Sequence, residues 1–430
     1  MDRILIKNGR VIDPASGTDR VTDILAENGK IAKIQENIAI TDDDTIVVYA
    51  DGLTVAPGLI DVHVHFRDPG FTYKEDIHTG AMAAKRGGFT TVVMMANTDP
   101  KMDNEKTLRE VLGRAGLEDI NILMVGNVTE NMEGKKLTDF KALKKAGAAA
   151  LSDDGMPIKD GGLMRAALIK AKELGMIISL HEEDPEYIVR SGINAGPVAD
   201  ELSYGGADRR AEIEMVKRDI ALARETGAVI DIQHISAKES VELVREAKKE
   251  GLAVYAEATP HHFTLTEDDV KRYGSNCKMN PPLREEDDRL AIIEGIRDGT
   301  VDMIATDHAP HSAEEKNKDI KEAPSGITGL ETSLALGITE LVDREDIPLN
   351  TLIERMTLAP ARIFGIDRGY LKEGAAADIV IFDENEEWIY DKSVSRSSNT
   401  PFLGWRLKGK VHYTIAGGRI VYDHEKEGNS

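Results

Sequence analysis

The sequence predicts an α/β protein: a (β/α)8 TIM barrel with a small β-sandwich domain that both ends of the chain build together. Two observations carry this prediction. Through the middle of the chain, eight short apolar segments alternate with helical segments. The two chain ends instead carry short strands joined by hairpin-turn signals. At 430 residues, the chain is long enough for one large barrel and an accessory domain.

The eight expected barrel strands are continuous apolar runs, as is typical of parallel strands covered on both faces. In chain order they are LIDVHVH (59–65), TTVVMMA (90–96), NILMVGN (121–127), AALSDD (149–154), MIISLH (176–181), AVIDIQH (228–234), AVYAEA (253–258) and VDMIATDH (301–308). An open doubly wound sheet is the alternative architecture. It is disfavoured because no glycine-rich nucleotide loop follows the first strand.

Glycines mark the ends of the helical segments that precede strands two to eight. A left-handed residue there closes the helix and lets the chain turn into the next strand. These glycines are Gly88, Gly116, Gly147, Gly175, Gly227, Gly251 and Gly299. Thr72 and Glu75 have the spacing of a capping box and predict the start of the first helix.

The chain ends resemble each other and differ from the middle. ILIKNGRVID and DILAENGKIAKIQ near the start predict strands with a turn at Asn28-Gly29, and HYTIAGGRIVYD near the end predicts a turn at Gly417-Gly418. We expect residues 1–54 and 367–430 to form one composite small β-domain, and residues 55–366 to form the barrel.

Composition excludes several classes of function. The net charge of −22 repels polyanions, so nucleic acid and anionic membranes are not expected partners. A small anionic substrate would therefore need local positive charge at its site. The single cysteine, Cys277, excludes an internal disulfide framework and a thiolate zinc site. We expect a cytoplasmic protein, because the sequence contains neither a signal-peptide pattern nor an apolar run of membrane-spanning length.

Histidines and aspartates gather where the expected strands end, which is where barrel enzymes carry their chemistry. Eight of the eleven histidines lie there or in the following loops: His63, His65, His181, His234, His261, His262, His308 and His311. The fourth strand ends in Asp153-Asp154 and the eighth in Asp307. Any one such histidine alone would indicate a structural residue. Together with carboxylates on converging strands, they predict a hydrolytic metal site.

In the order HVH, strand-four aspartate, LHEED, DIQHIS and ATDHAPH, the sequence resembles the amidohydrolase superfamily, in its dihydroorotase branch of the monofunctional bacterial and archaeal type. DVHVHFRDPG, MNPPLR and TDHAPH are the motifs closest to that branch. The resemblance extends over almost the whole chain and includes the two ends.

The resemblance implies a centre of one or two zinc ions, although manganese, cobalt and iron accept the same ligands. His63, His65 and Asp307 would hold one ion, and His181 and His234 the other. Many relatives bridge the two ions with a carboxylated lysine on strand four, which this chain lacks. Asp154 is the expected bridging ligand instead, with Asp153 as the alternative.

Substrate contacts also follow from the resemblance. A substrate carboxylate needs a cation in fork geometry, which the Arg67 guanidinium supplies. The other expected substrate contacts are His65, Asn97, Asn280, His311, Ser325 and Gly326. His261 and His262 match a family pattern, but we expect them to be structural because the ligand set is complete without them.

The implied reaction is the reversible cyclisation of N-carbamoyl-L-aspartate to (S)-dihydroorotate in de novo pyrimidine (UMP) synthesis, with Asp307 moving the proton. Another cyclic-amide hydrolase (dihydropyrimidinase, hydantoinase or allantoinase) is the nearest alternative. The missing lysine and Arg67 count against it. A non-catalytic partner of aspartate carbamoyltransferase is the second alternative, but such proteins typically lose metal ligands. An active enzyme could also bind that transcarbamoylase or form a homo-oligomer.

Overall fold

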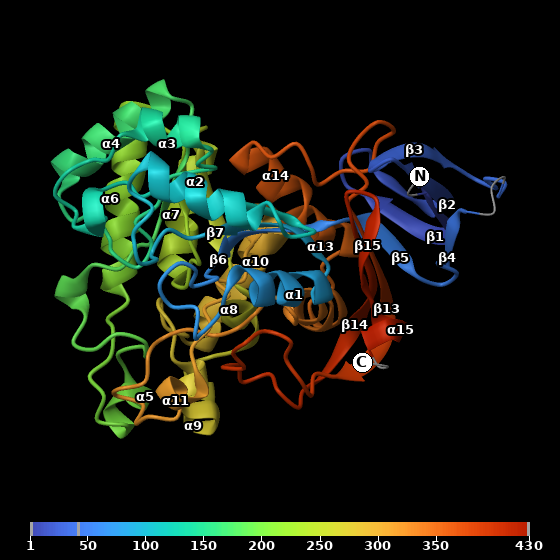
Figure 1. The fold of residues 1–430 in the computed structure, drawn as a ribbon. Coiled ribbons are helices and arrows are strands. Elements are labelled where there is room, and N and C mark those ends of the chain that lie inside the picture. Colours follow the sequence, from blue (N-terminus) through green and yellow to red (C-terminus); the bar gives the residue numbers. More distant parts are fainter. Residues whose placement is uncertain (1–2, 41–43, 428–430) are drawn as a thin grey trace.

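The barrel is present in the computed structural model, which describes residues 3–40 and 44–427. Its parallel strands form a three-stranded and a four-stranded sheet. They are β6 (Leu59–Val64), β7 (Phe89–Met94), β8 (Asn121–Met124), β9 (Ile178–Leu180), β10 (Ile230–Ile232), β11 (Val254–Ala258) and β12 (Met303–Ile304). Figure 1 shows helices surrounding these strands on one side of the molecule and the small β-sheet on the other. The predicted fold class is confirmed.

Two junctions close the ring. The expected fourth strand is reduced to one paired residue, Leu151, which bridges Gly126 on one side and Ile178 on the other. The chain turns at Asp154, shortly after Leu151, so the pairing with the two neighbouring strands does not extend beyond this residue. The second junction joins the last strand to the first, since the His65 amide donates to the His308 carbonyl at 2.8 Å. All strand carboxyl ends therefore meet at one rim.

The outer helices pack apolar faces against the strands. In α7, for example, Val241, Val244 and Ala247 are buried at helical spacing. The principal outer helices are α1 (Ile77–Arg86), α2 (Glu105–Ala115), α3 (Phe140–Ala146), α4 (Gly161–Glu173), α6 (Arg210–Thr226), α7 (Lys238–Lys249), α10 (Glu286–Asp298), α13 (Leu349–Met356) and α14 (Leu358–Phe364). Shorter helical segments are α5 (Pro197–Glu201), α8 (Pro260–Thr264), α9 (Asp269–Tyr273), α11 (Ala313–Lys316), α12 (Ser333–Leu336), α15 (His424–Glu427), the 3₁₀ turns Glu130–Met132, Pro185–Tyr187 and Gly274–Cys277, and a π-helical stretch, Gly337–Arg344.

Two local predictions about helix ends were wrong. The first helix is capped by Asp76, which forms a capping box with Thr79, and not by Thr72 with Glu75. Glu75 is buried instead and accepts hydrogen bonds from the side chains of Thr79 and Ser395. Gly116 closes α2 in a right-handed conformation, with φ −67°. The other six predicted glycines have positive φ and were predicted correctly.

Both chain ends contribute to one eight-stranded sheet, ordered β15-β14-β13-β5-β1-β2-β3, with β4 paired to β1. Its strands are β1 (Arg3–Asp13), β2 (Thr18–Glu27), β3 (Lys30–Gln35), β4 (Ile46–Tyr49), β5 (Thr54–Pro57), β13 (Ile379–Ile389), β14 (Arg406–Ala416) and β15 (Arg419–Asp423). The blue and red strands lie together in Figure 1, and β5 pairs with both β1 and β13. Positive φ values at Asn28-Gly29 and Gly417-Gly418 confirm both hairpin turns. The domain limits at residues 54 and 367 stay a prediction.

The small sheet has an apolar core of its own, which includes Ile4, Ile24, Val55 and Ile379, separate from the large barrel core. The barrel therefore has its own packed interior beneath the rim.

Among the described helices, none is both long enough and apolar enough to cross a membrane.

Two helix glycines differ in the space beside them and give a paired test. A Cβ at Gly80 in α1 would come within 2.4 Å of the buried Phe66 ring, whereas a Cβ at Gly113 in α2 meets nothing within 4 Å. We expect Gly80→Ala to lower the free energy of unfolding by about 1–3 kcal/mol through overpacking. Gly113→Ala should raise it by up to about 1 kcal/mol through helix propensity. Urea unfolding checks both signs, and equal shifts would contradict the packing at Phe66.

Candidate metal centre and active site

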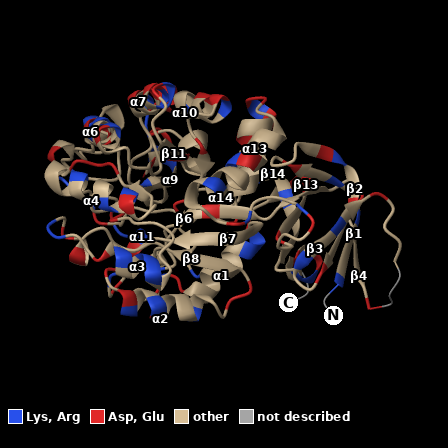
Figure 2. Cartoon of the chain, turned by 90° about the horizontal axis from the view of Figure 1, so that it is seen from above, with Lys and Arg blue, Asp and Glu red and all other residues tan. Residues whose placement is uncertain are grey.

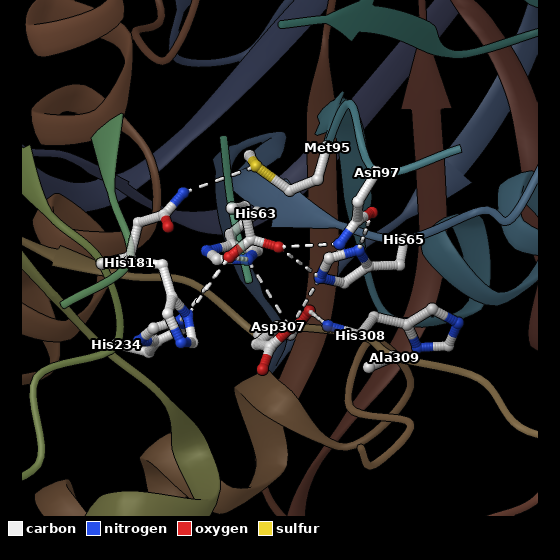
Figure 3. A network of polar contacts seen from close by, with 12 residues as sticks. His63, His65, Met95, Asn97, His181, His234, Asp307, His308 and Ala309 are labelled. Atoms are coloured by element: carbon white, nitrogen blue, oxygen red, sulfur yellow. Dashed lines mark hydrogen bonds and ion pairs between the residues drawn. The ribbon is translucent and has the colours of Figure 1, made fainter. Parts of the chain in front are cut away.

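The six predicted metal ligands come together at the rim of the barrel, and all of them except Asp154 are labelled in Figure 3. In two groups, each residue offers a ligand atom within 4.8 Å of the others: His63 with Asp154 and His234, and His63 with His65 and Asp307. All are buried. They reach this point from the ends of β6, β9, β10 and β12 and from the Leu151 junction, so barrel closure brings together residues that are far apart in sequence.

The Asp154 carboxylate lies at the centre of the cluster. Its Oδ1 is 3.6 Å from His63 Nε2, 3.4 Å from His181 Nδ1 and 3.8 Å from His234 Nε2. Its Oδ2 is 3.5 Å from His65 Nε2. Burial alone would raise the pKa of Asp154. His63 and the hydrogen bonds from the neighbouring imidazoles nevertheless hold it well below its usual range.

Asp153, the alternative bridging residue, faces away from the cluster. Its carboxylate accepts hydrogen bonds from the backbone amides of Val128 and Thr129, at 2.9 and 3.0 Å, and from the Thr129 hydroxyl. Burial raises the pKa of Asp153 to about 6, although these hydrogen bonds oppose the shift. Asp153 thus anchors the loop after β8, and Asp154 is the member of the pair that faces the histidines.

The donor set fits a divalent metal ion. His63 Nε2 is buried and has no hydrogen-bond partner among the described residues, yet it lies 3.6 Å from carboxylate oxygens of both Asp154 and Asp307. An unpartnered imidazole nitrogen facing two carboxylates is costly unless another group binds there. Imidazole nitrogens and carboxylate oxygens are ligands of zinc and related metals.

Three of the predicted site residues have a backbone that side-chain-bearing residues rarely adopt. Arg67, His234 and Asp307 have φ values of 57°, 32° and 46°. Each lies just beyond the end of its barrel strand, where the left-handed turn redirects the chain across the rim. Such strain persists only where surrounding packing enforces it, and it concentrates at functional sites.

A cavity of about 190 Å³ opens beside the cluster. Its lining contains every predicted substrate contact: His65, Arg67, Asn97, Asn280, His311, Ser325 and Gly326. The Asn280 Oδ1 atom is buried and has no hydrogen-bond partner in the part of the chain that the structure describes. It is therefore an acceptor free for a donor within this cavity.

Arg67 and Lys74 contact His311 at one side of the cavity. Arg67 donates from Nε to the Pro310 carbonyl at 3.2 Å and lies 3.4 Å from His311 Nε2. His311 Nδ1 lies 3.2 Å from the Lys74 amine, and its Nε2 lies 2.8 Å from the Ser325 carbonyl. Burial, helped by the charges of Arg67 and Lys74, lowers the pKa of His311 to about 2. His311 is therefore neutral at physiological pH, with Nε2–H donating to Ser325.

Asn97 lies between the cavity and the metal ligands. Its Oδ1 accepts from His65 Nδ1 at 3.0 Å, and its Nδ2 donates to Asp154 Oδ2 at 3.0 Å. The amide thereby fixes the orientation of both side chains.

Several residues that support the site were not found from the sequence. Glu257 and Glu183 contact ligand histidines, and Lys74 contacts His311. Asp61 joins the first and last strands by accepting from the amides of His63 and Thr306, and burial raises its pKa to about 6. Asp61 and Glu257 are charged residues within apolar strands, and this pattern could have indicated a role at the site. Lys74 lies in a polar loop, where a lysine is an ordinary residue.

His261 and His262 lie outside both ligand groups. His262 contacts the Thr259 hydroxyl at 2.7 Å and the Pro281 carbonyl at 3.1 Å, and so fixes the chain next to Asn280. Burial lowers the pKa of His261 to about 3, so this side chain is neutral.

Comparison with known proteins identifies the family. The amidohydrolase family model matches residues 54–421, which include the barrel and, of the small sheet, β5, β13, β14 and most of β15. The chain belongs to the amidohydrolase family. This amidohydrolase is 54% identical over 420 residues to the dihydroorotase of Clostridioides difficile strain 630, covering 98% of this chain and 100% of that protein. It is 52% identical to the dihydroorotase of Lactococcus lactis, covering 97% and 99%.

Solved structures share the fold of this amidohydrolase at lower identity. An L-hydantoinase (dihydropyrimidinase) from Arthrobacter aurescens has a TM-score of 0.88 at 26% identity, covering 98% of this chain and 96% of that one. A D-hydantoinase from Thermus sp. has a TM-score of 0.85 at 25% identity, covering 98% and 95%. The chain is therefore a metal-dependent cyclic amidohydrolase, and the residues of its own cavity must distinguish the substrates.

Charge outside the site is mixed. Figure 2 shows acidic and basic residues interspersed along the outer helices of the amidohydrolase. Within the cavity, Arg67 is the basic side chain in the lining, while Lys74 lies behind His311 and is paired with Glu315.

Because burial keeps His261 neutral, the pH dependence of protein stability tests whether this side chain is buried as described. Its folded pKa of about 3 lies below an ordinary value near 6.5, so protonation favours the unfolded chain. The His261 contribution to stability is complete above about pH 6.5 and is lost as the pH falls towards 3, by about 1.4 kcal/mol per pH unit. In metal-free protein, we expect His261→Leu to reduce the loss of stability between pH 6.5 and 5 by about 2 kcal/mol. Urea unfolding at both pH values measures this difference, and identical losses would mean that His261 is charged in the folded protein.

Proposed function

We propose that this chain is a dihydroorotase, which catalyses the reversible cyclisation of N-carbamoyl-L-aspartate to (S)-dihydroorotate in pyrimidine synthesis. The observation that carries the proposal is Arg67, whose guanidinium lines the cavity beside a cluster of imidazoles and carboxylates. The names of the relatives at 50–54% identity support the same reaction. Location in the cytoplasm is part of the proposal and agrees with a single, buried cysteine.

The proposed metal ligands divide into two sets around one bridging residue. His63, His65 and Asp307 would hold one zinc ion, His181 and His234 a second, and Asp154 would lie between them. When bound, divalent ions lower the pKa of water and polarise a carbonyl oxygen. A carboxylate bridge in place of a carboxylated lysine fits the position of Asp154 between all four imidazoles.

The remaining cavity residues would orient the substrate. Dihydroorotate keeps a carboxylate outside the reacting amide, and Arg67 can bind it through two parallel hydrogen bonds. Asn97 and Asn280 provide amide groups, and the neutral His311 holds the backbone at Ser325. This arrangement favours dihydroorotate over the uncharged rings of hydantoins, which present no carboxylate to Arg67.

Asp307 would move the proton. In cyclisation the carbamoyl nitrogen attacks the side-chain carboxyl carbon of aspartate, a C–N bond forms, and one oxygen leaves as water with net uptake of one proton. Asp307 Oδ1 lies 2.9 Å from His65 Nε2 and lines the cavity, so its carboxylate is within reach of a bound reactant. In hydrolysis the same group returns the proton to the ring nitrogen.

All of the proposed site residues come from one chain. Formation of a homo-oligomer, or of a complex with aspartate carbamoyltransferase, stays part of the proposal.

Replacing Arg67 tests the substrate. We expect Arg67→Met to lower kcat/KM for dihydroorotate by about 10²–10³-fold, because two charge-assisted hydrogen bonds are lost. The control is Arg165→Met, which removes an exposed partner of Glu225 on α4 and should leave activity unchanged. A spectrophotometric assay in both directions, with and without zinc, measures the effect. Equal activity of Arg67→Met, or turnover of hydantoin instead, would refute the assignment.

Paired aspartate variants test the bridging position. Asp154→Asn should lower the zinc content per chain and abolish activity, because it removes the central charge between the imidazoles. Asp153→Asn should retain the metal and lose mainly stability, since its contacts are with the loop after β8. Metal analysis after dialysis, alongside thermal unfolding, separates the two. Loss of metal from Asp153→Asn alone would reverse the assignment.

A further inference from the structure

The four ligand histidines differ in what holds the ring nitrogen that faces away from the cluster. His63 Nδ1 lies 3.0 Å from Glu257 Oε2, and His181 Nε2 lies 3.0 Å from Glu183 Oε2. His65 Nδ1 instead contacts a neutral amide, whereas His234 Nδ1 has no partner within residues 3–40 and 44–427. Only one histidine of each proposed metal position thus contacts a carboxylate through its outward nitrogen.

The two carboxylates select opposite nitrogens. A carboxylate can only accept, so Glu257 requires the proton on His63 Nδ1 and leaves the Nε2 lone pair directed at Asp154 and Asp307. Glu183 requires the proton on His181 Nε2 and leaves Nδ1 directed at Asp154 and at His234 Nε2, 3.0 Å away. Each imidazole therefore presents a different atom to the same centre.

The two glutamates reach their histidines from different places. Glu257 belongs to β11, is fully buried in the barrel interior, and its second oxygen has no hydrogen-bond partner among the described residues. Glu183 follows His181 at the rim and lines a neighbouring cavity of about 580 Å³. The second carboxylate oxygen of Glu183, Oε1, also has no hydrogen-bond partner among the described residues. Glu257 also faces the buried Asp231 carboxyl, and the charge of Glu257 adds to the effect of burial in raising the pKa of Asp231.

We propose that Glu257 and Glu183 are positioning residues, one for each metal position, which fix the tautomers of His63 and His181 and increase their affinity for the metal. The inference rests on the proposed metal centre. Negative charge behind an imidazole makes the ligand more basic, and loss of such a partner typically weakens metal binding about 10–100-fold. Without these carboxylates, His63 or His181 could turn a protonated ring nitrogen, which cannot bind a metal ion, towards Asp154.

The experiment compares Glu257→Gln and Glu183→Gln with wild type and with Glu267→Gln. Glu267 is a matched control, because it is also buried but accepts from Asn194 and touches no ligand histidine. Zinc affinity is measured by chelator competition, and zinc content by metal analysis. We expect each of the two variants to bind one zinc ion about 10–100-fold more weakly while retaining the other, and Glu267→Gln to match wild type.

Nitrogen NMR of zinc-loaded, ¹⁵N-histidine-labelled protein gives a readout independent of activity. In wild type we expect zinc on Nε2 of His63 and on Nδ1 of His181, and faster exchange of the outward N–H in the corresponding variant. If Glu257→Gln fails to fold, Glu183→Gln at the rim still provides the test. Wild-type zinc affinity in both variants would overturn this inference alone, whereas a wild type that binds no zinc would overturn the metal centre as well.

Discussion

The structure of the rim depends on one buried carboxylate, that of Asp154, which faces imidazole nitrogens of four histidines. Removing a carboxylate from water costs several kcal/mol unless paired groups surround it. Here those groups arrive on separate strands, so the charge can be satisfied only when the ring has closed. The electrostatics of the site and the closure of the barrel therefore support each other.

The site combines several features that reduce stability. Three residues have left-handed backbones, buried nitrogens lack partners, and His261 and His311 are kept neutral by burial. The apolar core beneath the rim offsets these costs, since the strands and helices around it are packed with buried aliphatic side chains. An acidic protein can also present a cation to a substrate in this way, because Arg67 acts at short range where the distant negative charge is screened.

Local sequence patterns were sufficient for most of the fold. Apolar runs located the barrel strands, and Asn28-Gly29 and Gly417-Gly418 located two turns, because each feature depends on neighbouring residues. The shortened strand at Leu151 depends on tertiary packing and was not found. The helix start at Asp76 was missed because Glu75, the expected capping partner, contacts the distant Ser395 instead. For the site, histidines and aspartates at strand ends predicted the cluster, whereas the expected substrate contacts came from the family resemblance. The contacts of Glu183, Glu257 and Lys74 join distant segments, and the nitrogen that each histidine presents is a property of those contacts alone.

The position of β5 in the small sheet has a consequence for how the chain is made. Its two neighbours are β1, which leaves the ribosome before it, and β13, which is synthesised only after the entire barrel. During translation one edge of β5 therefore has no native partner, and an unpaired edge is a template for wrong association. Completion of the small sheet is thus a late event in biosynthesis, and chains that stop before β13 are left with this edge exposed.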